Sequence, residues 1–178
     1  VVAFSQGNGY AGDTTVSGIL EINQRRVTEP DSRLIVKQGG SVICSSAEIA
    51  FAGVTLTGGS ISTDSSGFAL NGPLEVLPSA TTSTLSGIIT LPDGPATWTV
   101  ADGPAAEDLL VTAQLRELVL TDSSLRLSGP GTSTFTANHT LNEIVAVSGG
   151  ATLLGTSANT DLLVNGAAVT ASGRLRNI

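Results

Sequence analysis

Four carboxylates in the middle of the chain are the residues whose type and spacing could support chemistry. They are Asp93, Asp102, Glu107 and Asp108. Glycan-cleaving enzymes use paired carboxylates, or a carboxylate beside a basic residue, as their acid and base. No Lys, Arg or His occurs between Gln38 and Leu115, so a local base and a clamp for an anionic sugar are both missing. Asp93 and Asp102 each precede Gly-Pro, which is typical of turns, and we expect the four acids to be structural.

The single histidine and the single cysteine add neither a metal site nor a nucleophile. His139 lies in "ANHTLN", and a metal site would need further His, Cys or carboxylate ligands beside it. The four acids have oxygen ligands that suit calcium, but no dense Asp-Gly repeat supports such a site. Cys44, in "SVICSS", is expected to be a buried thiol without a disulfide partner. With no set of nucleophile, histidine and carboxylate, we expect no catalytic residue, no cofactor, no metal and no enzyme.

The only tryptophan, Trp98, lies at the centre of "ATWTVADG". Strand alternation places Trp98 and Val100 on one face and Thr97 and Thr99 on the other, so we expect Trp98 to point into the core. An outward Trp98 would instead be a platform for stacking a sugar or an anchor at an interface. Thr-x-Thr units recur too irregularly to predict a regular hydroxyl array of the kind that binds ice, and strand propensity explains them.

Short strands are the elements that must position these residues. Hydrophobic residues make up 40% of the 178 residues but aromatic residues only 3%, so the core must consist of Val, Leu, Ile and Ala. Many apolar runs alternate with Thr, Ser or Glu, which is the period of a strand with one solvated face. Gly-, Asn- and Pro-containing turns separate these runs at short intervals. Residues 104–118 fit a helix or a strand, and we predict strand.

Two all-β architectures fit this pattern. A β-sandwich has longer strands, spaced about 8–12 residues apart and joined by hairpins. A β-solenoid has short strands at tighter spacing, and each coil stacks on the previous one. Because the runs here often follow one another after about six to ten residues, we predict a parallel β-solenoid with three short sheets, with the β-sandwich as the alternative.

A long internal repeat is also visible. The segment "YAGDTTVSGIL" (residues 10–20) aligns with "FTANHTLNEIV" (residues 135–145), which places Tyr10 on Phe135 and Val16 on Leu141. Each segment follows a glycine-spaced stretch. We therefore predict a single solenoid domain over residues 1–178, with one long repeat over about residues 1–125 and the start of a second over about residues 126–178.

Three stretches resemble a known family. They are "NGYAGDTTVSGILEI" (8–22), "LSGIITLPDGPATWTVADGPAAEDLLVTAQL" (85–115) and "SSLRLSGPGTSTFTANHTL" (123–141). The family is that of the autotransporter-associated β-strand repeats, also called passenger-associated transport repeats, of large exported bacterial proteins. The third stretch departs from the family pattern, with Phe135 in place of Tyr and His139 in place of the first Thr. The resemblance implies a right-handed parallel β-helix at the bacterial cell surface or outside the cell, with no catalytic residues to carry over.

Charge and hydropathy narrow the classes of partner. The net charge is −7, and Lys37 is the only lysine. This composition argues against a nucleic-acid partner, because nucleic-acid binding needs clustered cations. No apolar run approaches the ~20 residues of a membrane-spanning helix. The chain contains no Met, and we expect an export signal upstream of Val1.

The expected function is structural. Terminal coils of a solenoid present unpaired strand edges, and no cap of different composition is apparent at either end of the sequence. We expect a rod or fibre element of an exported bacterial surface protein, with its ends covered by self-association or by neighbouring repeats of a longer chain. The alternative is a glycan-binding adhesin module whose partner is a surface glycan.

Overall fold

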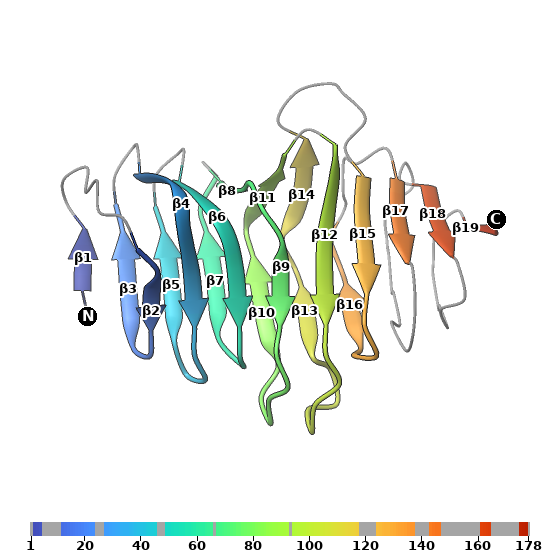
Figure 1. The fold of residues 1–178 in the computed structure, drawn as a ribbon, viewed down its shortest axis with the longest axis horizontal. Coiled ribbons are helices and arrows are strands. Elements are labelled where there is room, and N and C mark those ends of the chain that lie inside the picture. The colour runs from blue at the N-terminus through green and yellow to red at the C-terminus, as the bar shows by residue number, and fades with distance from the viewer. Residues whose placement is uncertain are drawn as a thin grey trace.

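The chain folds as a right-handed parallel β-helix, as the sequence predicts (Figure 1). The computed structural model describes residues 2–4, 12–23, 27–45, 49–65, 67–92, 94–117, 124–137, 143–146, 161–164 and 175–177. The regular structure in these residues consists of 19 strands, and every pairing between them is parallel. No helix long and apolar enough to cross a membrane occurs in this part of the chain.

The first sheet contains one strand from each of seven coils. Its inward positions stack in register from Leu20 through Val42 and Ile61 to Leu85 and Val111. Side chains of like size therefore lie above one another along the rod. In order across the sheet, the strands are β1 (Val2–Phe4), β3 (Ile19–Ile22), β5 (Ser41–Cys44), β7 (Ser60–Thr63), β10 (Ser83–Ser86), β13 (Leu109–Val111) and β16 (Ser133–Phe135).

The second sheet has 12 strands and divides into two branches at β6. It begins with β2 (Thr14–Val16), β4 (Val27–Val36) and β6 (Ile49–Leu56). Ala50 and Phe51 of β6 pair with one strand of the next coil, and Val54 to Leu56 pair with another. The first branch contains β8 (Phe68–Leu70), β11 (Ile88–Leu91) and β14 (Gln114–Glu117). The second branch contains β9 (Leu74–Val76), β12 (Pro95–Val100), β15 (Ser124–Ser128), β17 (Glu143–Ala146), β18 (Asp161–Val164) and β19 (Leu175–Asn177).

The branching at β6 gives the solenoid its three faces. The coils that begin with β7, β10 and β13 each contribute one strand to the first sheet and one to each branch. The three short sheets of the prediction are thus the first sheet and the two branches. The segment at residues 104–118 contains β13 and β14 and no helix, so the strand prediction for it is confirmed.

An aliphatic core runs between the sheets. In the second sheet Leu34, Val54, Leu74, Trp98 and Leu127 stack in register on successive coils, and all five are buried. Burial of each such side chain stabilises the fold by about 1.5–3 kcal/mol before the loss of chain entropy is counted. The side chains at the buried positions of the predicted alternation therefore stabilise the stacking of the coils.

Parts of the sequence-based prediction lie outside the described residues. They are the apolar runs at Leu118–Leu120, Leu153–Leu154 and Ala168–Thr170, for which the sequence pattern also predicts strands, together with Tyr10, Asp93, His139 and Leu141. The long repeat over about residues 1–125 accordingly stays a prediction.

Candidate functional site

Three of the four acids of the predicted cluster are among the described residues, and they share one loop. Asp102, Glu107 and Asp108 lie in the loop from β12 to β13, which projects at the lower edge of Figure 1 beside the loop from β9 to β10. The two loops contact each other, since Ala105 N donates a hydrogen bond to Ser79 O at 3.1 Å.

Asp108 is a structural clamp in this loop. Its side chain is buried, and its two carboxylate oxygens accept hydrogen bonds from Gly103 N and Thr132 N, both at 2.8 Å. One carboxylate thereby joins its own loop to the corresponding turn of the next coil. Because both oxygens are occupied by backbone donors, Asp108 is poorly placed to act as an acid or base. This geometry supports the structural interpretation of Asp108.

Cys44 is a buried thiol, which confirms the prediction for this residue. Burial, with a smaller contribution from the charge of Asp64, raises the pKa of Cys44 to about 12. The thiol is therefore neutral at physiological pH and is not an activated nucleophile. Among the residues that the structure describes, no group of three His, Cys, Asp or Glu side chains could hold a metal ion.

Trp98 points into the core, as its position in the alternation predicts. Its ring stacks on that of Phe135, with centroids 6.1 Å apart and an interplanar angle of 19°. A fully buried ring cannot act as a surface platform for a sugar. The Thr-x-Thr units form no common array, because Thr97 and Thr99 lie in the second sheet and Thr134 in the first.

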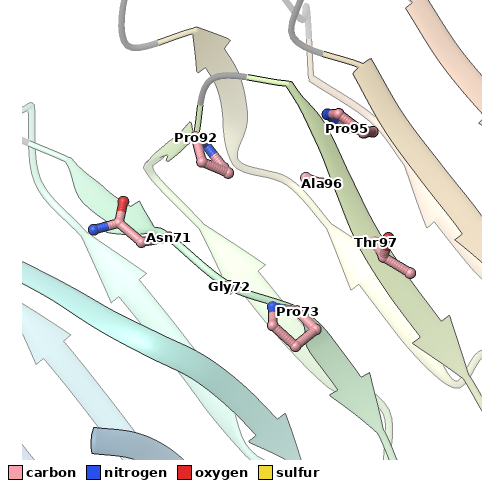
Figure 2. Close-up of a pocket in the computed structure, with 7 residues that line it drawn as sticks. All are labelled: Asn71, Gly72, Pro73, Pro92, Pro95, Ala96 and Thr97. Atoms are coloured by element: carbon pink, nitrogen blue, oxygen red, sulfur yellow. The ribbon is translucent and has the colours of Figure 1, made fainter. Parts of the chain in front are cut away.

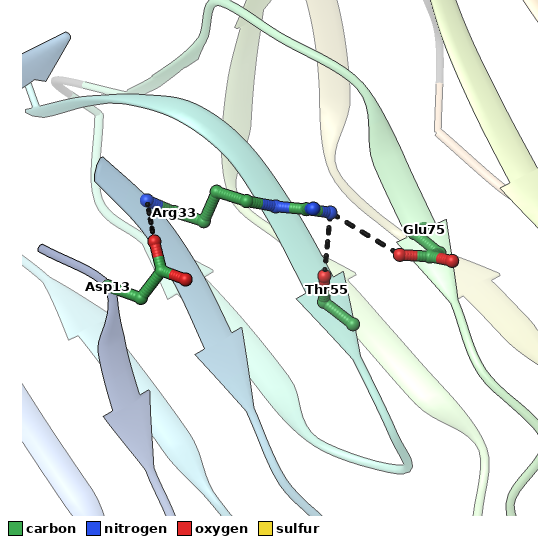
Figure 3. Close-up of polar contacts among 4 residues, drawn as sticks. All are labelled: Asp13, Arg33, Thr55 and Glu75. Atoms are coloured by element: carbon green, nitrogen blue, oxygen red, sulfur yellow. Dashed lines mark hydrogen bonds and ion pairs between the residues drawn. The ribbon is translucent and has the colours of Figure 1, made fainter. Parts of the chain in front are cut away.

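A polar network on the outer face of the second sheet links four successive coils (Figure 3). Arg33 N donates a hydrogen bond to a carboxylate oxygen of Asp13 at 3.0 Å. The guanidinium Nη2 of Arg33 donates to Thr55 Oγ1 at 3.1 Å and forms an ion pair with Glu75 Oε2 at 3.3 Å. The arginine side chain passes over Gly53, the residue in register with it on β6. Sequence reasoning missed this network because its members are 20 to 42 residues apart.

A hollow lies where the two branches of the second sheet meet (Figure 2). Its volume is about 330 Å³, and none of the described residues that line it carries a charge. The lining comes from the corner between β8 and β9 and, on the next coil, from the β11–β12 connection and the start of β12. The residues are Asn71, Gly72, Pro73, Pro92, Pro95, Ala96 and Thr97.

The hollow exists because β12 is longer than β9. β9 begins at Leu74, which pairs with Trp98, so the first three residues of β12 have no strand opposite them on that side. The chain before β9 instead turns tightly against β6. At Gly72 a Cβ would overlap the carbonyl oxygen of Ala52, so only glycine fits this approach. The corner is thereby drawn inward relative to β12.

The comparisons with known proteins add no relative. No family model matches the chain, and neither the curated proteins nor the solved structures contain a match. The function must therefore be inferred from the fold and from the geometry of the sites.

Proposed function

We propose that this chain is a structural rod or fibre element without catalytic activity. The observation that carries the proposal is the parallel stacking of coils around one aliphatic core, which extends from Val16 to Phe135 in the described part of the chain. Each coil contacts mainly its neighbours, so such a solenoid is a stiff element that can be extended by adding coils. The roles of Asp108 and Cys44 in the interior are consistent with this proposal, because both residues stabilise the fold.

Self-association through the terminal coils is the second part of the proposal. Among the described strands, β1 and β2 end the two sheets on one side, and β16, β14 and β19 end the first sheet and the two branches of the second on the other. The outward-facing backbone edge of a terminal strand can continue a sheet with another chain. Within a longer protein, neighbouring repeats would cover the same edges.

The proposed setting is the bacterial cell surface or the extracellular space, as part of an exported protein. It rests on the resemblance of three segments to autotransporter-associated repeats, at residues 8–22, 85–115 and 123–141. A charged fraction of 13%, against about 25% in ordinary soluble domains, supports a role in packing against like repeats rather than against nucleic acid. The glycan-binding alternative loses its platform with the burial of Trp98, so any glycan contact must use another surface.

A proline at the edge of β2 tests self-association. Lys37 N donates to Val16 O at 2.8 Å, so Val16 faces β4, and the backbone N–H of the preceding residue, Thr15, faces away from it. Thr15→Pro therefore removes an edge donor without removing a bond to β4. Thr15→Val keeps the N–H and is the matched control.

Light scattering coupled to size-exclusion chromatography gives the readout. The parent chain and Thr15→Val are expected to increase in mass with concentration, whereas Thr15→Pro remains at the mass of one chain or associates only at higher concentration. If all three remain monomeric at every concentration, self-association is wrong and only the role within a longer repeat array stands.

A further inference from the structure

We propose that the hollow between the β8–β9 corner and the start of β12 binds a single pyranose ring. The proposal names a new site and is independent of self-association, because it concerns the side of the solenoid and not its ends. It is built from the seven residues that line the hollow in Figure 2.

Backbone groups of β12 are directed at the hollow. Ala101 N donates to Val76 O at 3.0 Å, so the odd-numbered residues of β12 direct their N–H and C=O groups toward β9. Since β9 begins at Leu74, the N–H of Thr97 and the C=O of Pro95 face the space before that strand, where β9 offers them no ladder partner. The hollow thus presents one backbone donor and one backbone acceptor about two residues apart.

Two described side chains of the lining add further hydrogen-bonding capacity, and both are uncharged. The Asn71 amide offers both donors and an acceptor, and the Thr97 hydroxyl offers one more of each. Both residues are exposed. A ligand that is rich in hydroxyl groups, each of which donates and accepts, matches this mixed set better than a ligand with only one type of group.

Three prolines make the hollow rigid and give it apolar walls. Pro73, Pro92 and Pro95 have a fixed φ, so the hollow is formed before binding and little order is lost on binding. Their ring CH₂ groups suit the apolar CH face of a sugar. The volume of about 330 Å³ is at the small end of ligand pockets, which fits one ring. An extended peptide fits poorly, because from Leu74 onward β9 already occupies the position beside β12 where a peptide strand would pair.

One cation lies beside the hollow and distinguishes two sources of the ring. Arg126, an exposed residue of β15, is in register with Thr97. A pyranose with a carboxylate would gain from Arg126, whereas a neutral pyranose would not. Neutral and acidic pyranoses share the ring that the hollow would hold, and the experiment distinguishes them by testing both kinds of sugar.

The test is an amide chemical-shift titration of the isotope-labelled chain. The probes are the methyl pyranosides of glucose, galactose and mannose, and free glucuronate and galacturonate. Saturable shifts centred on Asn71 and Thr97 with at least one probe are expected, and they should weaken by about tenfold or more in Asn71→Ala and Thr97→Phe. Thr99→Val, a change at an exposed position two residues further along β12 and outside the hollow, should leave binding unchanged.

The variants also define the failure of the proposal. Arg126→Gln should weaken only the uronates if the ligand is acidic and should have no effect if it is neutral. Absence of saturable shifts with every probe would overturn the proposal, as would binding that survives both Asn71→Ala and Thr97→Phe. Retention of the remaining amide spectrum shows that each variant is folded.

Discussion

Asp108→Asn is the substitution that most sharply separates a structural carboxylate from a catalytic one. In the folded chain both oxygens of Asp108 accept backbone N–H groups at 2.8 Å. Asparagine keeps one acceptor but turns its NH₂ group toward the second N–H, so one charge-assisted bond is lost and a buried donor is left without an acceptor. A hydrogen bond to a charged group contributes about 1.5–3 kcal/mol, and we expect a loss of about 3 kcal/mol in the free energy of unfolding.

Urea unfolding followed by tryptophan fluorescence measures this loss. Trp98 is the only tryptophan and is fully buried, so its emission reports the coils on either side of the clamp. With a urea dependence of about 2 kcal/mol per molar, the midpoint should fall by about 1.5 M. The exposed Asp102 of the same loop is the matched control, and Asp102→Asn should stay within about 0.5 kcal/mol of the parent chain. Equal midpoints for Asp108→Asn and Asp102→Asn would refute the structural role of this carboxylate.

Four further predictions concern the core and one corner. Trp98→Ala removes a ring that stacks on Phe135 and should destabilise the fold by about 3–5 kcal/mol in circular-dichroism melts, with a loss below about 1 kcal/mol contradicting its place in the core. Gly72→Ala places a Cβ against Ala52 O and should destabilise by about 2 kcal/mol or more, whereas Gly94→Ala, with open space but a φ of 87°, should cost only about 1 kcal/mol. Because the folded pKa of Cys44 is about 12 against 9.0 in the unfolded chain, its thiol should resist a disulfide reagent until urea is added. For the same reason the contribution of Cys44 to the free energy of unfolding is full below pH 9.0 and falls as the pH rises toward about 12. Cys44→Ala should abolish this fall. If the fall persists in Cys44→Ala, it comes from other groups.

Local features of the fold followed from the sequence because they depend on neighbouring residues. Alternation within "ATWTVADG" correctly predicted that Trp98 points inward, since successive side chains of any strand point to opposite faces. The strands at β8, β9, β11 and β13 were likewise predictable from short apolar runs between turns. The solenoid followed from the close spacing of those runs.

Features that depend on register between coils did not follow from the sequence. Coil length varies, from 13 residues between Leu162 and Leu175 to 29 between Trp98 and Leu127. Without the length of each coil, nothing in the sequence places Arg33 beside Glu75. The branching of the second sheet at β6 and the hollow beside β12 arise from the same variation, because both are differences in length between stacked strands.

Electron microscopy of the purified chain tests the proposed structural role most directly. We predict rods as wide as a single solenoid, whose length grows in steps of one chain as the concentration rises. Such growth is expected because each end of the solenoid presents the terminal strands of both sheets. Thr15→Pro should shorten these rods toward a single chain. Isolated single-chain particles at the highest concentration reached, or particles joined along their sides, would contradict assembly through the terminal coils.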